Sequence, residues 1–409
     1  MMASQLSPGK KEGLLRRVAV VAYAEYPWDP RVRREAETLV EDGYIVHVIA
    51  LRPRAGASSP HLGGVHLHEV PLEMRRGGKI RYAYQYAMFL LLSTFLLLRL
   101  QLGSRFDLVH VHSLPDFQVF CALPLKLWRV PVLLDLHEAM PEILAARFRN
   151  SPNALLPRMA AFLEQLSSRF ADHVIVANDG IRAAVVSRGV PEARLTTVYN
   201  VSDIPVRSPA PEEIRRQLGL PDGRLLVHAG GINPERDLET LVRAVAHLPA
   251  DLDVHLILAG DGDPKYVDQL TRVADDRLVA DRVQFVGKLN REEALALMAL
   301  SEVGIITLQE NPLTQLAWPT RIVEYADLRK PLVVPKLGFL SQMLGDGADY
   351  YMPGDAESLS LALSRAIRNP DRAESAVLKV QGICRRFDWT RMREVLRNVY
   401  RSMEGSRVA

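Results

Sequence analysis

Residues 225–237 read LLVHAGGINPERD, and this stretch decides the class of fold. Its first five residues are mostly apolar, as in a buried strand, and a helical pattern begins at residue 238. Between them, Gly230 and Gly231 allow backbone N–H groups to approach an anion, and the dipole of the following helix favours negative charge. The stretch predicts one unit of a doubly wound α/β sheet with a phosphate site, although a plain surface turn has a similar composition.

The same alternation of strand and helix runs along the rest of the chain, which predicts parallel sheets. It is interrupted at 202–211 (SDIPVRSPAP), where three prolines indicate a linker. Expected strands lie at 17–24, 45–51, 65–71, 107–112, 130–136, 173–177 and 195–199 before the linker, and at 225–229, 254–259, 283–286, 303–308 and 331–335 after it.

With 409 residues the chain exceeds the size of one hydrophobic core, so two Rossmann-like domains with a cleft between them are expected. The expected division is a polar tail at 1–13, a first domain at 14–203, a second at 204–385, and a helical segment at 386–409 able to pack back on the first domain.

The composition is typical of a globular protein, with 48% hydrophobic and 24% charged residues. Two cysteines, Cys121 and Cys384, exclude a disulfide framework or a cysteine metal cluster. The net charge of +3 comes without a dense basic face, so nucleic acid is not an expected partner. No apolar segment follows the polar residues 1–12, so no secretory signal is expected and the expected location is the cytoplasm.

Two further segments of the second half fit a nucleotide site. Gly260 and Gly262, in AGDG at 259–262, allow a turn that lies against a nucleoside base or simply closes a loop. A helix N-terminus is expected at PTR, 319–321, and Glu324 one turn later can accept both hydroxyls of a ribose. By spacing alone, a glutamate on a solvated helix face is the better interpretation of Glu324.

Seven short segments, in order along the chain, resemble motifs of the retaining glycosyltransferases of family 4, which have the GT-B fold. The resemblance spans about residues 18–400, nearly the whole chain. Its segments are YPWDPRVRREA (26–36), FDLVHVH (106–112), DLHE with PE (135–138 and 141–142), LILAGDG (256–262), VQFVG (283–287), PTRIVEY (319–325) and KPLVV (330–334).

The resemblance implies that the second domain binds the donor, with Arg236 on its diphosphate and Glu324 on its ribose. The other donor-binding residues it implies are Gly230, Gly231, Gly260, Gly262, Thr320 and Arg321. On the acceptor side it implies Arg31, His137 and Glu138, and His112 looks like the family's active-site histidine. His110 lies on the same strand face, so either histidine can be the working residue. The catalytic residues expected are thus His112, Arg236 and Glu324.

Two positions depart from the family pattern. Gly231 stands where the family commonly has an arginine, and Arg321 is the nearest candidate to replace that charge. Leu316 stands where the family has a glutamate, which leaves Glu310 or Asn311 to reach the sugar hydroxyls.

The resemblance implies a retaining transfer from a UDP- or GDP-sugar, which is a substrate, so no cofactor is expected. Asp251-Leu-Asp253 has the spacing of a metal motif but lies at a strand start, so it is interpreted as a turn and no metal is predicted. A nucleotide-sugar epimerase of this fold and a non-catalytic scaffold subunit are the alternative functions.

The segment 82–98 contains no charged residue and follows Arg75, Arg76, Lys79 and Arg81. It is short for a membrane span, which leaves three interpretations: a span, a fully buried helix, or a domain helix that contacts a bilayer surface. The basic cluster and the tyrosines favour the third. We therefore expect a peripheral protein on the inner face of the cell membrane, in contact through 75–102, with a lipid-linked acceptor or a growing polysaccharide or glycolipid.

Overall fold

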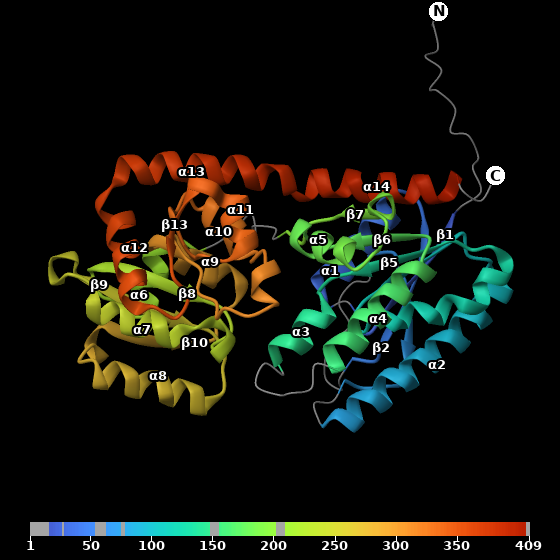
Figure 1. Ribbon diagram of the computed structural model, residues 1–409, viewed down its shortest axis with the longest axis horizontal. Helices are drawn as coiled ribbons and strands as arrows, with labels where there is room; N and C mark the ends of the chain where they lie inside the picture. The colour runs from blue at the N-terminus through green and yellow to red at the C-terminus, as the bar shows by residue number, and fades with distance from the viewer. Residues whose placement is uncertain are drawn as a thin grey trace, which may run out of the picture.

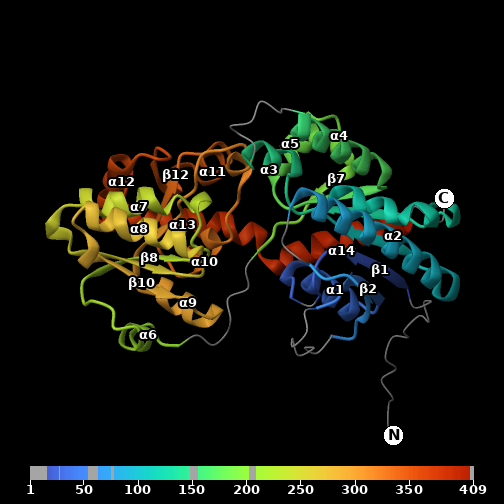
Figure 2. The ribbon, with the colours of Figure 1, turned by 90° about the horizontal axis from the view of Figure 1, so that it is seen from below.

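The computed structural model of the protein describes residues 16–26, 28–53, 63–74, 78–147, 155–201 and 209–405. Two parallel sheets, each covered by helices, lie side by side as separate domains (Figures 1 and 2). The first has seven strands in the order β3-β2-β1-β4-β5-β6-β7, and the second has six in the order β10-β9-β8-β11-β12-β13. The predicted fold class, two doubly wound parallel-sheet domains, is confirmed.

The first domain follows the predicted alternation. Its central strands β4 and β5 are buried along their whole length, because helices cover both faces of a parallel sheet. Its strands are β1 (Arg17–Ala22), β2 (Ile45–Leu51), β3 (His66–Val70), β4 (Leu108–His112), β5 (Val132–Leu136), β6 (His173–Val176) and β7 (Leu195–Thr197). Its helices are α1 (Pro30–Glu41), α2 (Lys79–Ser104), the 3₁₀ segment η1 (Asp116–Trp128), α3 (Met140–Arg147), α4 (Leu155–Phe170), α5 (Asp179–Ser187) and η2 (Glu192–Arg194).

The second domain repeats the pattern with one additional edge strand, β13, which the sequence analysis did not anticipate. Its strands are β8 (Arg224–Ala229), β9 (Val254–Ala259), β10 (Val283–Gly287), β11 (Ser301–Ile305), β12 (Leu332–Pro335) and β13 (Ala348–Tyr351). Its helices are α6 (Pro211–Gln217), α7 (Leu238–His247), α8 (Pro264–Asp276), α9 (Arg291–Ala299), α10 (Arg321–Asp327), α11 (Gly338–Leu344), α12 (Ala356–Arg368) and α13 (Pro370–Cys384). Short 3₁₀ turns are η3 (Pro234–Arg236), η4 (Ala250–Leu252), η5 (Ala280–Arg282), η6 (Thr314–Leu316), η7 (Gly345–Gly347) and η8 (Arg385–Phe387).

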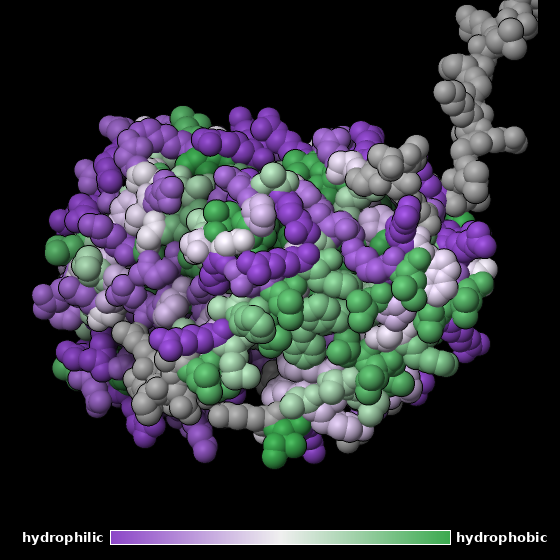
Figure 3. Space-filling model, turned by 45° about the vertical axis from the view of Figure 1, so that its right-hand side comes forward, coloured by the Kyte–Doolittle hydropathy of each residue, from purple (hydrophilic) through white to green (hydrophobic). Residues whose placement is uncertain are grey.

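Helix α2 is the apolar segment predicted at 82–98, and it is longer than predicted. Its residues 80–104 are long and apolar enough to cross a membrane by length and composition alone: an 18-residue window has mean hydropathy 1.6, and 22% of that window is buried. One side packs against the domain through residues spaced four apart: Gln85, Phe89, Ser93, Leu97 and Gln101. The other side is exposed and apolar, and it contributes to the apolar surface of the first domain seen in Figure 3.

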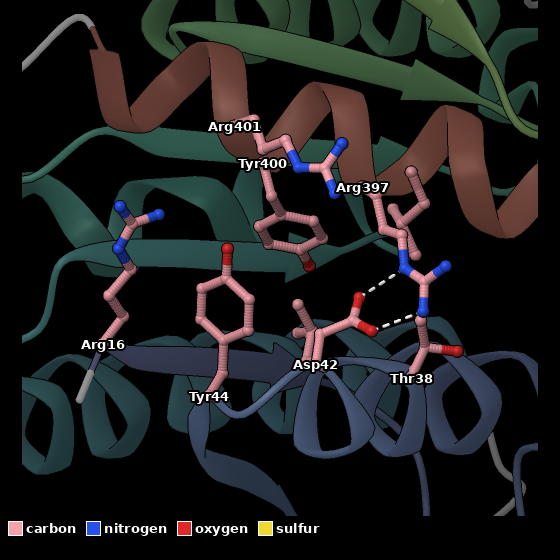
Figure 4. A pocket seen from close by; sticks show the side chains of 9 residues that line it. Arg16, Thr38, Asp42, Tyr44, Arg397, Tyr400 and Arg401 are labelled. Atoms are coloured by element: carbon pink, nitrogen blue, oxygen red, sulfur yellow. Dashed lines mark hydrogen bonds and ion pairs between the residues drawn. The ribbon is translucent and has the colours of Figure 1, made fainter. Parts of the chain in front are cut away.

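Helix α14 (Trp389–Gly405) crosses from the second domain and lies along the first. Arg397 forms an ion pair with Asp42 at the end of α1, and the Tyr400 hydroxyl lies 2.7 Å from Nδ1 of His110 in β4. A cavity of about 320 Å³ opens beside this contact, with Arg16 and Arg401 among its lining residues (Figure 4). The last helix of the chain therefore belongs structurally to the first domain and reaches its central strand.

Candidate active site

The loops that follow β8 and β9 lie directly against each other. A Cβ atom on Gly260 would be 1.7 Å from the carbonyl oxygen of Gly230, and one on Gly262 would be 2.3 Å from that of Ile232. Gly230 and Gly260 also have φ values of +152° and +154°, which side chains disfavour. These glycines are therefore required for the two loops to pack together at the carboxyl edge of the sheet.

Arg321 lies over this glycine contact. Its Nη1 donates to the carbonyl oxygen of Ala229 at 3.2 Å and lies 3.1 Å from Nδ1 of His228. Burial, and then the nearby Arg236 guanidinium, lower the pKa of Arg321 to about 10, which leaves it charged at neutral pH. His228, which the sequence analysis missed, is fully buried, and burial followed by the two arginines holds its pKa well below its usual value.

Arg236 belongs to the 3₁₀ turn η3, and α7 begins only at Leu238. The helix expected from residue 238 is confirmed, and Asp237, at φ +50°, separates it from the turn that contains Arg236. The second expected helix start, at 319–321, is also confirmed, because α10 begins at Arg321 with Thr320 as its N-cap. In the described part of the chain, neither Arg236 nor Arg321 has a carboxylate as an ion-pair partner. Two cations near a glycine-lined loop form a site for an anion.

Glu324 is half-buried in the first turn of α10, and its Oε1 lies 3.9 Å from Arg291. Gly231 is exposed at the tip of its loop, where a Cβ atom would be 3.2 Å from the Asn233 amide. These positions surround the anion site with groups able to contact a nucleoside and its phosphates.

The residues near the position of the missing family glutamate have other contacts. The Leu316 carbonyl oxygen would lie 2.9 Å from a Cβ on Gly180 of α5, so this turn touches the first domain. Glu310 accepts a hydrogen bond from Gln315 at 3.0 Å, and the Asn311 side chain accepts one from the Thr314 backbone at 3.0 Å. Asn311 therefore shapes its own loop.

On the first domain, His112 and His137 lie stacked at the carboxyl ends of β4 and β5. Nδ1 of His112 is 2.8 Å from Nε2 of His137, and Asp135 Oδ2 lies 3.3 and 3.6 Å from the same two nitrogens. Burial lowers the pKa of each histidine to about 3, so both rings are neutral and share one proton along this contact. Neutral imidazoles beside a carboxylate can orient a hydroxyl group.

The remaining acceptor-side residues lie near this pair. Arg31 donates to Asp29 at 3.1 Å, and although burial opposes it, this contact lowers the pKa of Asp29 to about 2. Asp29 also caps α1, a role that its place before Pro30 could have indicated. Glu138 is exposed directly after His137. His112 itself is 1% exposed, so a substrate reaches its ring only after its neighbours move.

His110, the other candidate histidine, has a different environment. Its ring is fully buried and 4.2 Å from that of His112, with Nδ1 against the Tyr400 hydroxyl and Nε2 facing Glu35 and Asp135. Burial, followed by the Asp135 charge, holds the pKa of Glu35 well above its usual range. The sequence analysis missed Glu35 and Tyr400 because helix pattern alone does not distinguish a glutamate that points into the domain.

Two family models match this chain. Residues 28–201 match a glycosyl transferase 4-like domain, and residues 211–379 match the glycosyl transferases group 1. The D-inositol 3-phosphate glycosyltransferase of Mycolicibacterium smegmatis is 27% identical over 64% of this chain and 60% of its own length, so the alignment spans less than two thirds of that relative. An uncharacterized glycosyltransferase of Methanocaldococcus jannaschii is 22% identical over 94% of this chain and 98% of its own.

Solved structures share the two-domain fold. The sucrose-phosphate synthase of Thermosynechococcus elongatus superposes with a TM-score of 0.75 at 18% identity, over 96% of this chain and all of the other. HepE of Anabaena, in complex with UDP-glucose, superposes with a TM-score of 0.70 at 19% identity, over 94% and 99% of the two chains. Two domain models together cover most of the length of this chain, and the chain therefore belongs to the group 1 glycosyltransferase family, with a glycosyl transferase 4-like first domain and the GT-B fold.

Proposed function

We propose that this enzyme transfers a sugar from a UDP- or GDP-linked donor to an acceptor on the first domain, with retention of the anomeric configuration. The arginine pair Arg236 and Arg321 carries the proposal, because neither guanidinium group forms an ion pair with a carboxylate in the described part of the chain, and the pair suits an anion such as a diphosphate. HepE, of the same fold, binds UDP and UDP-glucose, which makes uridine nucleotides the first donors to test.

In the proposed reaction, the acceptor oxygen bonds to the anomeric carbon on the face from which the phosphate oxygen leaves. The phosphate takes the acceptor proton, and Arg236 and Arg321 stabilise the charge that grows on the diphosphate. His112 and His137 orient the acceptor and the donor sugar as neutral rings. Two arginines supply the positive charge at the diphosphate, so donor binding is proposed to need no metal ion.

The donor class can be identified by thermal unfolding with UDP, GDP, ADP and dTDP, each with and without EDTA. A ligand at 100 times its Kd that binds only the folded chain adds roughly 2.7 kcal/mol to the free energy of unfolding. We expect one nucleotide to raise Tm, unaffected by EDTA, and Glu324→Ala to abolish the rise through loss of the ribose contact. The matched control is Glu374→Ala, at an exposed carboxylate 3.6 Å from Arg329. We expect this variant to show the same rise in Tm as the wild type. No rise with any nucleotide would instead favour the scaffold function.

The first domain has one large apolar face made by α2, η1 and α4, on the side shown in Figure 3. On α2 and on α4 the exposed residues form a single stripe along the helix, and η1 lies between the two helices. The apolar face comprises Ile80, Tyr84, Leu91, Phe95 and Leu102 of α2, Leu123, Leu127 and Trp128 of η1, and Leu155, Met159, Phe162 and Leu166 of α4.

The exposed charges on the three helices of the apolar face are positive, although Asp172, after α4, pairs with Lys126 of η1. Helix α2 contains no acidic residue, and the acidic residues of η1 and α4, Asp116 and Glu164, are buried. Exposed arginines include Arg99 on α2 and Arg158 on α4, while the predicted Arg75 and Arg76 lie outside the described residues. An apolar face whose helices carry exposed arginines fits the surface of an anionic bilayer, where each cation contributes about 1 kcal/mol. We propose that this face binds the inner surface of the cell membrane, and that the acceptor is lipid-linked.

Flotation with vesicles containing phosphatidylglycerol tests the membrane contact. We expect the protein to float, and the triple variant Leu91→Glu, Phe95→Glu, Phe162→Glu to stay at the bottom, because each apolar side chain lost removes about 1.5–3 kcal/mol of burial. The control is Leu278→Glu, Leu361→Glu, at two exposed leucines of the second domain, and we expect this variant to float. A wild-type protein that remains at the bottom with these vesicles contradicts the proposal.

A further inference from the structure

Behind the two acceptor-side histidines lies a buried cluster of four ligand-type side chains. It contains Glu35 from α1, His110 and His112 from β4, and Asp135 from β5, and each offers one nitrogen or oxygen within 4.8 Å of all the others. All four side chains are at least nine-tenths buried. The cluster belongs to the first domain and lies apart from the arginines proposed for the diphosphate.

The atoms that face each other in the cluster lack hydrogen bonds. Oε2 of Glu35, Nε2 of His110 and Oδ2 of Asp135 are each buried without a partner. Nε2 of His110 lies 3.9 Å from Glu35 Oε2 and 3.8 Å from Asp135 Oδ2, distances too long for hydrogen bonds. Among the described residues, one oxygen of each of these two buried carboxylates has no hydrogen-bond partner, which is costly, and a further group between these atoms would satisfy them.

The spacing of the cluster fits a metal ion between its members. The four ligand atoms lie within 4.8 Å of one another, and Nε2 of His110 lies 3.8 Å from Asp135 Oδ2 and 3.9 Å from Glu35 Oε2. Ligand atoms of one tetrahedral ion, each about 2.0–2.2 Å from it, are about 3.3–3.6 Å apart, so a small inward movement of these side chains completes a coordination sphere.

The surroundings of the histidines also fit metal ligation. A ligating histidine usually has its second ring nitrogen held by another polar group, and Nδ1 of His110 is held by the Tyr400 hydroxyl at 2.7 Å. Tyr400 lines the cavity shown in Figure 4, and its hydroxyl contacts His110, so a single side chain separates this cavity from the cluster. Helix α14 thus contributes an outer-shell group from the far end of the chain.

We propose that Glu35, His110, His112 and Asp135 bind one divalent cation, Zn²⁺ or a related ion that accepts imidazole and carboxylate ligands. Two carboxylates and a divalent cation sum to zero charge, which resolves the presence of two acidic groups in the domain interior. The role of the ion is structural, because it fixes the position of the His112 ring from the interior of the domain. This inference does not rest on the proposed donor or acceptor.

Metal content measured by mass spectrometry tests the site on the full chain, purified without a metal-affinity step. We expect close to one Zn²⁺ or Mn²⁺ per chain in the wild type, and a loss of most of it in Glu35→Gln and His110→Gln. The control variant is His47→Ala, His68→Ala, because these two rings stack 5.2 Å apart on the sheet and are the alternative place for an adventitious ion. Metal that disappears in the control and stays in Glu35→Gln overturns the proposal.

Tyr400→Phe keeps all four ligands and tests the site even if the ligand variants fail to fold. Loss of an outer-shell contact typically weakens a metal site by roughly 10–100-fold, so competition with a chromophoric chelator should show a Kd raised by that factor. An unchanged Kd overturns the assignment of His110 as a ligand. A wild-type chain that contains no metal, and whose Tm does not rise with Zn²⁺ or Mn²⁺, overturns the proposal altogether. These results require no nucleotide and are independent of whether the donor site works.

Discussion

Replacing Arg321 with alanine is expected to lower turnover by roughly 10²–10³-fold, the usual cost of one charge-stabilising donor. Arg321 is held over the glycine loops by the Ala229 carbonyl and lies beside His228, so its guanidinium is already oriented before the donor binds. Arg236→Ala should lower turnover by a similar factor. The double variant should lose less turnover than the product of the two single fold-losses, because the guanidinium groups interact. The measurement is the initial rate of nucleotide release from the donor sugar identified by thermal unfolding.

Comparison of nucleoside diphosphate with monophosphate separates this role from a structural one. If Arg321 binds the diphosphate, UDP should stabilise the wild type more than UMP, and Arg321→Ala should remove the difference. A structural defect would reduce the stabilisation by UDP and by UMP equally. Arg365→Ala is the matched control, because this arginine pairs with Asp349 at 3.4 Å in the same domain and is half exposed. Full turnover in Arg321→Ala would refute the diphosphate site proposed here.

Gly260→Ala is expected to destabilise the second domain by about 3 kcal/mol or more, through overpacking and a disfavoured backbone conformation together. The new Cβ would lie 1.7 Å from the Gly230 carbonyl oxygen, and φ is +154°, so the loops after β8 and β9 must separate. Because Arg321 lies over this contact, nucleotide binding should be lost along with stability. Urea unfolding followed by circular dichroism measures the change.

The control for Gly260 is Gly382→Ala, a helical position of α13 where a Cβ atom meets nothing within 4 Å. That variant should be neutral or stabilising by about 0.5–1 kcal/mol, because alanine loses less conformational entropy in a helix. Equal midpoints for Gly260→Ala and the wild type would show that the two loops do not pack as described.

The sequence was sufficient for the fold class and for the order of elements along the chain. Strands such as 225–229 and 254–259 have one buried apolar run each, and the structure places β8 and β9 there. The glycines after them indicated tight loops, because only glycine permits those conformations. The sequence analysis missed β13, because this edge strand has only four residues, too few to show a periodic pattern.

The candidate site also combines features that the sequence predicts with features that it does not predict. Its individual residues, such as Arg236, Glu324 and His112, are readable from motifs, because each motif is a short segment with its own geometry. Their environment is not, since it depends on contacts between segments far apart in sequence. The Tyr400 hydroxyl reaches His110 across 290 positions, and Glu35 faces Asp135 only because α1 packs beside β4 and β5.

Local pattern and chain order by themselves determined two parallel-sheet domains, the glycine loops and the apolar character of α2, because these depend on periodicity and backbone freedom within a few residues. Only the tertiary structure decided that His110 and His112, on one strand face, have different neighbours. It also decided that α4 and η1 extend the apolar face of α2. The convergence of four buried polar side chains is likewise a result of tertiary packing. The physical reason is that burial and electrostatic environment are properties of neighbours in space, which the chain order does not specify.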